Sequence, residues 1–123
     1  AADNIKVSLF IEPTIAAIDF TLEIGAPVVE LHTGVYANAS GADQTQALDR
    51  LRQVATYAAA AGLQVNAGHG LHYDNVAAIA AIAKLKELNI GHAIVARALF
   101  VGLQNAVSEM REAMNAARGT QSL

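Results

Sequence analysis

The segment LQVNAGHGLH, residues 63–72, joins a short apolar run to a histidine that stands between two glycines. The run Leu63–Ala67 has the length and composition of a buried β-strand. Gly68 and Gly70 lack a Cβ atom, so the backbone around His69 can turn sharply and a ligand can approach its amides closely. The segment therefore predicts a strand that ends in a tight turn open to a ligand.

The same order, a strand-length run followed by a helical pattern, occurs four times along the chain. The expected strands are Val7–Ile11, Val28–His32, Leu63–Ala67 and Glu87–Ile90. The expected helices begin near Pro13, near Asp43, after Asp74 and near Leu103, and a polar loop is expected from Thr33 to about Gly41. Four consecutive β-α units predict an α/β fold in which crossover helices join parallel strands.

Each expected helix has an apolar face, and glycines stand where three of them should end, at Gly25, Gly62 and Gly119. The side chain of Asp74 is a candidate cap for the third helix. The apolar positions are Ile15, Ile18 and Leu22 in the first helix, Ala47, Leu48, Leu51, Val54, Ala55 and Ala58 in the second, Val76, Ile79 and Ala83 in the third, and Leu103, Ala106, Val107, Met110 and Met114 in the last.

The length of the chain raises the question of how such a sheet is completed. A closed barrel of eight β-α units takes about 250 residues, and this chain has 123. Four parallel strands alone leave two unpaired sheet edges, which favour association with other strands. We therefore expect residues 1–123 to form a single domain whose sheet is either open or completed by another polypeptide.

Composition excludes several classes of function. The formal net charge is −3, which gives no general attraction to nucleic acid or to an anionic membrane. There is no cysteine, so disulfides and thiolate metal sites are excluded. No apolar run approaches the roughly 20 residues of a membrane span. These features favour a cytoplasmic protein that binds neither nucleic acid nor membrane.

Titratable side chains follow three of the expected strands, namely Glu30 with His32, then His69, then His92. In parallel α/β sheets, reactive groups gather beyond the carboxyl ends of the strands. Glu30 and His32 are two positions apart, so they face the same side of a regular strand. A single histidine at a strand end is more often structural. Three histidines at successive strand ends predict a site for proton transfer near neutral pH.

The stretch Asn89-Ile90-Gly91-His92 repeats the order of strand, glycine and histidine, and the apolar run Ala93–Ala96 follows it. Backbone amides in such a loop, followed by a helix N-terminus, make an anion site. In eight-stranded barrels the loops after the last two strands commonly bind phosphate. If these are the last two strands, Gly70 and Gly91 are placed to bind phosphate.

Three further residues have two interpretations each. Arg97 follows the Gly91-His92 stretch, where it could neutralise a phosphate or form an ion pair between helices. His72 and Tyr36 fall in expected loops, where each could touch a ligand, although a solvent-facing position is the more common case for such residues.

Four segments, read together and in order, resemble the C-terminal half of the pyridoxine 5′-phosphate synthase family. They are VSLFIE, GAPVVELHTGVYANA, GLQVNAGHGLHYDNVAAIAAI and ELNIGHAIVARALFVGL, and the similarity runs from about Ile5 to Gly119. The resemblance implies the C-terminal half of a (β/α)8 TIM barrel that works without metal or organic cofactor. It also implies two kinds of protein partner: the N-terminal half of the barrel, in the same or a companion chain, and further copies in a homo-oligomer, an octamer in that family.

The resemblance also implies a reaction and roles for five residues. The family condenses 1-deoxy-D-xylulose 5-phosphate with 3-amino-2-oxopropyl phosphate to pyridoxine 5′-phosphate, releasing phosphate and water. By resemblance, His69 donates a proton during the loss of water or phosphate, and Glu30 supports polar or cationic intermediates. Gly70, Gly91 and His92 match positions that hold the phosphate of the amino ketone.

Two alternatives to this function remain open from the sequence. The family's N-terminal half carries an Asn-x-Asp-His segment, further arginines and two basic catalysts, and these motifs are absent here. The chain could therefore be a half-barrel that binds phosphate without catalysing a reaction. Histidine and glutamate at strand ends are also zinc ligands, which leaves a metal-dependent barrel hydrolase as a second alternative.

Overall fold

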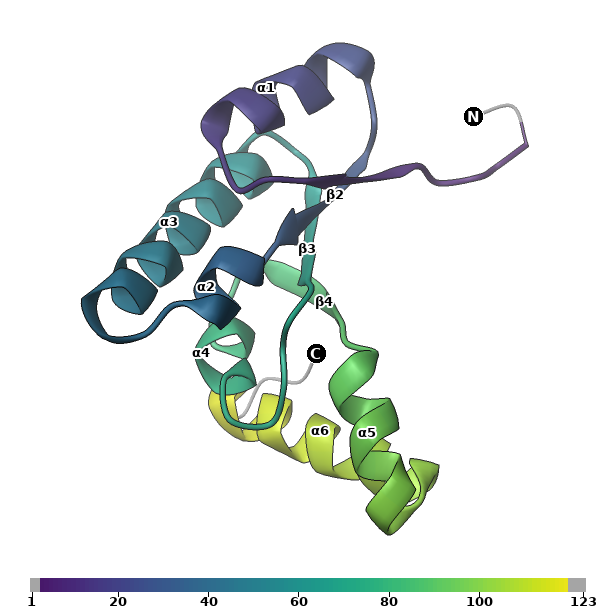
Figure 1. The fold of residues 1–123 in the computed structure, drawn as a ribbon. Helices are drawn as coiled ribbons and strands as arrows, with labels where there is room; N and C mark the ends of the chain where they lie inside the picture. The colour runs from purple at the N-terminus through teal and green to yellow at the C-terminus, as the bar shows by residue number, and fades with distance from the viewer. Residues whose placement is uncertain (1–2, 120–123) are drawn as a thin grey trace.

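A computed structural model describes residues 3–119 of the chain (Figure 1). The four strands are β1 (Ser8–Ile11), β2 (Val28–His32), β3 (Gln64–Gly68) and β4 (Leu85–Asn89). All neighbours pair in parallel, and their order in the sheet is β1-β2-β3-β4. The predicted α/β fold with four consecutive parallel strands is confirmed; β2 has the predicted boundaries, and the other strands differ from them by at most two residues.

The helices are α1 (Ile15–Ile24), α2 (Gly34–Asn38), α3 (Gly41–Ala60), α4 (Val76–Ala80), α5 (His92–Val101) and α6 (Leu103–Arg118). In Figure 1, α1 and α3 lie side by side along one side of the sheet, and α5 and α6 lie together beyond β4. Helix α6 also packs against α4. None of the helices within residues 3–119 combines the length and the apolar character needed to cross a bilayer.

Along β2, buried apolar side chains alternate with partly exposed polar ones. Val29 and Leu31 of β2 are fully buried, whereas Glu30 and His32 between and after them are partly exposed. Because successive side chains of a strand point to opposite faces, the apolar residues face the helices and the polar ones face the other side. The prediction that Glu30 and His32 share a face is confirmed.

The core joins the sheet to four helices. Buried side chains from α1, α2, α3 and the α4 region meet those of β2 and β3 in one cluster. Within the expected apolar faces, Ile18, Leu51, Val54 and Met110 are buried. Four other side chains of these expected apolar faces are at least 38% exposed to solvent, namely Ile15, Leu22, Leu103 and Val107.

The segment predicted as a polar loop, Thr33 to Gly41, contains helix α2, so this prediction was wrong. The helix is anchored by Tyr36, which is 4% exposed and whose hydroxyl donates a hydrogen bond to the carbonyl of Asn75 at 2.6 Å. Burial also raises the pKa of the Tyr36 phenol. Tyr36 is therefore a core residue, and neither of the roles considered for it from the sequence applies.

The start of α4 also differs from its prediction. Asn75, not Asp74, is the N-cap residue, and it forms no side-chain hydrogen bond to the helix. Its Oδ1 accepts a hydrogen bond from the amide of His72 at 2.7 Å, and its Nδ2 donates to the carbonyl of Gly70 at 3.1 Å. Asn75 thus fixes the turn after His69 instead of capping the helix. The helix ends at Ala80, before the expected position Ala83.

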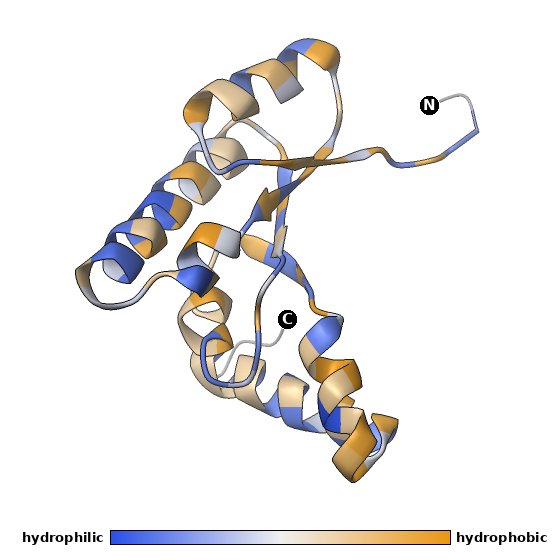
Figure 2. Cartoon of the chain, in the orientation of Figure 1, coloured by the Kyte–Doolittle hydropathy of each residue, from blue (hydrophilic) through white to orange (hydrophobic). Residues whose placement is uncertain are grey.

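The sheet is open at both ends within the described residues, because β1 pairs only with β2 and β4 only with β3. Figure 2 shows hydrophilic residues along the outer side of α3 and hydrophobic ones along α5. Leu99 and Phe100 of α5 are 82% and 85% exposed. An open parallel sheet with exposed apolar helix surface is what half of a closed barrel presents.

Candidate active site

A cavity of about 550 Å³ lies at the carboxyl ends of the strands. Its walls come from all four strand ends and from the start of α5. Its lining is Phe10, Glu30, His69, Gly70, Leu71, His72, Asn89, Ile90, Gly91, His92 and Ala93. All five residues predicted to form a site, Glu30, His69, Gly70, Gly91 and His92, therefore meet at a single cavity.

His69 stands in a turn with an unusual backbone. Its φ is +91°, a region that side-chain-bearing residues rarely adopt and that often marks functional sites. Buried Thr33 holds this turn from the neighbouring strand. The Thr33 amide donates to the Gly68 carbonyl at 2.9 Å, and the Thr33 hydroxyl donates to the His69 carbonyl at 2.6 Å. The turn is thus fixed by contacts 36 residues away in sequence.

The glycines around His69 have different tasks. Gly70 has φ +76°, and an added Cβ would lie 2.8 Å from the Cβ of Ala37. Gly68 does not have positive φ and is the last residue of β3. An added Cβ at Gly68 would lie 2.6 Å from Oε2 of Glu30. The sequence-based role in the turn holds for Gly70, whereas Gly68 makes room for the carboxylate on β2.

Glu30 lies across β3 from Asn89, the last residue of β4. Asn89 Nδ2 donates to Glu30 Oε1 at 2.7 Å. The carboxylate is thereby oriented along the cavity wall and retains acceptor capacity for a ligand, since each carboxylate oxygen has two lone pairs. Glu30 can accept hydrogen bonds from, or balance the charge of, a cationic group bound there.

His32, which follows Glu30 on the same face, contacts His69 instead of the cavity. The centroids of the two imidazole rings are 4.5 Å apart and their planes differ by 30°, a stacked arrangement. The ring of Phe10 lies on His32 with centroids 4.9 Å apart. The amide of Gly34 donates to His32 Nδ1 at 3.0 Å. His32 therefore supports the wall of the cavity from behind.

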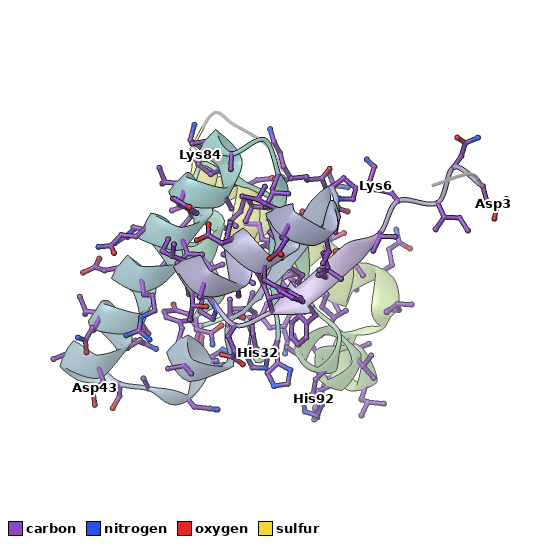
Figure 3. All side chains as sticks on the ribbon, turned by 90° about the horizontal axis from the view of Figure 1, so that it is seen from above. Asp3, Lys6, His32, Asp43, Lys84 and His92 are labelled. Carbon is purple, nitrogen blue, oxygen red and sulfur yellow. The ribbon has the colours of Figure 1, made fainter. Side chains whose placement is uncertain are left out.

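At the other end of the cavity, Gly91 is the N-cap residue and His92 is the first residue of α5. No side chain caps this helix, so its first amides are free to bind an anion. An added Cβ at Gly91 meets nothing within 4 Å. Figure 3 shows the His92 ring pointing outward on the same side of the molecule as His32.

The structure also places Arg97 and His72, two other residues considered as possible ligand contacts. Arg97 donates to Glu109 Oε2 at 2.9 Å, so the ion-pair interpretation is confirmed for it. Hydrogen bonding and charge from Glu109 raise the pKa of Arg97, and Arg97 lowers the pKa of Glu109. His72 is exposed at the rim of the cavity, where its Nδ1 accepts a hydrogen bond from the Asp74 amide at 3.2 Å.

Metal ligands are not grouped in the part of the chain that the structure describes. Between residues 3 and 119, no three His, Asp or Glu side chains come together in a way that could hold an ion. The described residues thus offer by themselves no ligand set of the kind that a metal-dependent hydrolase needs.

Thr33, Gly34 and Asn89 are parts of the site that were not predicted from the sequence. Asn89 was within a quoted stretch, and its place at the end of β4 opposite Glu30 was a usable signal. Thr33 and Gly34 carried no such signal, because their role depends on the pairing of His32 with Gly68 between β2 and β3.

The chain is similar in sequence to known proteins over most of its length. The family model of the pyridoxal phosphate biosynthesis protein PdxJ matches residues 1–116. A pyridoxine 5′-phosphate synthase of Thioalkalivibrio sulfidiphilus is 59% identical over 118 residues, which are 95% of this chain and 48% of the relative. One of Legionella pneumophila strain Corby is 56% identical over 114 residues, 92% of this chain and 46% of the relative.

Two consequences follow from these matches. The chain spans about half the length of the curated relatives it matches. The match nevertheless extends over nearly the whole chain and includes every residue that lines the cavity. The chain therefore belongs to the family of the pyridoxal phosphate biosynthesis protein PdxJ.

Proposed function

We propose that this chain is the C-terminal half of a pyridoxine 5′-phosphate synthase barrel and carries half of its active site. The reaction is the condensation of 1-deoxy-D-xylulose 5-phosphate with 3-amino-2-oxopropyl phosphate to pyridoxine 5′-phosphate, with release of phosphate and water. One observation carries the proposal: Glu30, His69 and the first residues of α5 line the same cavity. A proton donor, a carboxylate and an anion site are the groups that such a condensation needs.

The phosphate of the amino ketone binds at the start of α5 in this proposal. No side chain caps the start of this helix, so its first amides are free to donate to the phosphate, and the helix dipole favours its negative charge. The backbone of Gly70 faces the same cavity from the turn after β3. The absence of a side chain at Gly91 leaves the space that the phosphate oxygens occupy.

His69 acts as the general acid. When the amine of one substrate adds to the ketone of the other, the adduct carries a hydroxyl group on the former carbonyl carbon. His69 gives a proton to that hydroxyl, which leaves as water while the nitrogen lone pair forms the C=N bond. Glu30 lies beside the turn that holds His69 and stabilises the positive charge that develops on the protonated imine.

The other half of the barrel supplies what this chain lacks. In this proposal β1 and β4, which have one strand neighbour each within residues 3–119, pair with strands of the N-terminal half. That half also contributes the groups for the second substrate and the catalytic bases. We further propose that the completed barrel forms a homo-oligomer in the cytoplasm.

The proposal is tested by restoring the missing half. The 123-residue chain is joined to the N-terminal half of the Thioalkalivibrio sulfidiphilus relative, a product called the completed chain below. We expect the completed chain to form pyridoxine 5′-phosphate and inorganic phosphate from the two substrates, and the 123-residue chain alone to form neither.

A folded completed chain that forms no product would contradict the proposal. Binding of inorganic phosphate by that inactive protein would then favour the second candidate, a phosphate-binding half-barrel. The observation that favours this candidate is that the free amides of α5 belong entirely to this chain.

A further inference from the structure

The stacked ring of His32 has no part in the chemistry proposed above, yet it lies directly behind the proton donor. We propose that His32 is a positioning residue, an imidazole with an unprotonated Nδ1 that holds the ring of His69 in the orientation needed to reach the substrate. This inference rests on the proposed function of His69. It adds a second histidine whose task is to hold the first one in place and not to transfer a proton.

The hydrogen bond to His32 indicates which of its two ring nitrogens carries the proton. Its Nδ1 accepts the N–H of Gly34 at 3.0 Å, so the lone pair must be on Nδ1 and the proton on Nε2. A protonated His32 would direct a second N–H at the N–H of Gly34, losing this bond and placing two donors against each other. The tautomer with its proton on Nε2 is therefore the one that fits this hydrogen bond. The ring also meets Phe10 and His69, and it borders a small cavity whose lining includes Glu12 and Arg50, two side chains of opposite charge.

His69 needs such support because its own ring has little else to hold it. Within residues 3–119 no hydrogen bond from another residue reaches the His69 ring, and Thr33 holds only its main-chain carbonyl. The stack on His32, with ring centroids 4.5 Å apart, is thus the contact that fixes the ring plane. A catalytic group displaced by about 1 Å can lose a factor of about 10² in rate.

The absence of a side chain at Gly34 leaves the space that the His32 and His69 rings occupy. An ideal Cβ at this position would lie 2.3 Å from His32 Cε1, 2.9 Å from His32 Nδ1 and 3.2 Å from His69 Cδ2. Any side chain at Gly34 must therefore push the two rings out of place. The glycine is needed for this packing and not for its backbone conformation, because its φ is not positive.

The first part of the test measures the tautomer in the unchanged protein. Nitrogen NMR of the completed chain, labelled with ¹⁵N in histidine, distinguishes a protonated from an unprotonated ring nitrogen. Near pH 7 we expect His32 to be neutral with an unprotonated Nδ1 coupled through the hydrogen bond to the Gly34 amide. A charged His32, or one with its proton on Nδ1, would overturn the proposal.

The second part changes the support and observes His69. His32→Ala removes the stack, and His32→Phe keeps an aromatic ring but no acceptor for Gly34. We expect His32→Ala to lower kcat about 10- to 100-fold with a nearly unchanged KM, and to shift the ring nitrogen signals of His69. His32→Phe should retain more of kcat than His32→Ala. Gly34→Ala should resemble His32→Ala, and Tyr57→Phe, which changes only the outer surface, should alter neither quantity.

The outcomes of these experiments bear separately on the role of His32 and on the proposed function. An unchanged kcat and unchanged His69 signals in folded His32→Ala would overturn the positioning role. If the completed chain with native His32 forms no product, the proposed function fails, and the nitrogen spectrum alone then decides whether His32 has an unprotonated Nδ1. If His32→Ala does not fold, the spectrum of the unchanged protein and the kcat of His32→Phe decide the matter.

Discussion

The two ends of the cavity are built in different ways. At the β2–β3 end, His69 stands in a strained turn that Thr33 holds by two hydrogen bonds and that His32 supports by stacking. At the α5 end, Gly91 and His92 are exposed and offer mainly free backbone amides. The end that holds His69, the proposed proton donor, is thus preorganised by contacts within this chain. The end at α5, where we propose that phosphate binds, is open, and its geometry depends less on packing within the chain.

The largest effect should come from removing His69, the proposed proton donor, at the β2–β3 end. We expect His69→Asn in the completed chain to lower turnover by a factor of about 10²–10⁴, the usual loss for general acid catalysis. Asparagine is chosen because it tolerates positive φ better than most residues, so the turn should persist. The measurement is the rate of phosphate release under saturating substrates.

Tyr57→Phe is the control for this change. It removes a surface hydrogen bond of 2.6 Å to Asp19, far from the cavity lining. Its turnover should equal that of the unchanged protein. An active His69→Asn enzyme with unchanged turnover would remove His69 from the mechanism.

A pair of alanine substitutions compares the two ends directly. At Gly68 a Cβ would lie 2.6 Å from Glu30 Oε2 and 2.8 Å from the Asn89 carbonyl, so the strands must shift. We expect Gly68→Ala to cost about 1–3 kcal/mol of unfolding free energy, as overpacking does. Gly91→Ala meets nothing within 4 Å and should change stability by less than about 0.5 kcal/mol.

The two variants should also differ in phosphate binding. Gly91→Ala should weaken binding of the amino-ketone phosphate, because its methyl group enters the space left for the ligand. Urea unfolding and phosphate titration of both variants provide the measurements. Equal stability losses at the two glycines would contradict the difference between the ends.

A smaller effect is expected from the threonine that holds the turn. Thr33→Val keeps the shape of the side chain but leaves the His69 carbonyl without its 2.6 Å partner. We expect a loss of about 1–2 kcal/mol in unfolding free energy. Thr33→Ser restores the hydroxyl and should recover most of this loss. If serine and valine behaved alike, the hydroxyl would not be what fixes the turn.

The smallest effect concerns Glu109, which lies on α6 away from the cavity lining. Arg97 holds the pKa of this carboxyl below its ordinary value of 4.5. A carboxyl whose pKa is lower in the folded state stabilises the fold above its unfolded pKa, and this contribution is lost as the pH falls through the folded value. Glu109→Gln should therefore differ from the unchanged protein at pH 7 and converge with it toward pH 3. A stability difference that grew on acidification would contradict the ion pair.

Much of the fold could be predicted because it depends on patterns of apolar and polar residues within short segments of the sequence. The alternation of apolar runs and amphipathic helices predicted four parallel strands, and strand ends predicted where Glu30, His69 and His92 would gather. Helix α2 was missed because its segment is polar in composition, and its anchor is a contact from Tyr36 to the Asn75 carbonyl, 39 positions along the chain. No local pattern reports a contact of that kind.

The roles of the glycines in the site also could not be predicted from local sequence. A glycine near a histidine in the sequence is compatible with a tight turn, with space for a ligand or with space for another side chain. Gly70 proved to be a turn, Gly68 a space for Glu30, and Gly34 a space for two rings. Only the backbone angles and the neighbours of each glycine in the folded structure separate these cases.

We propose that both ends of the cavity form one phosphate site together with its proton donor, so inorganic phosphate should affect both ends at once. A titration of the completed chain with inorganic phosphate, followed by the backbone amide signals in NMR, measures this. We expect saturable shifts at Gly70, Gly91 and His92, together with a shift at the His69 ring, all with one dissociation constant. Saturable shifts elsewhere, with these four signals unchanged, would contradict it.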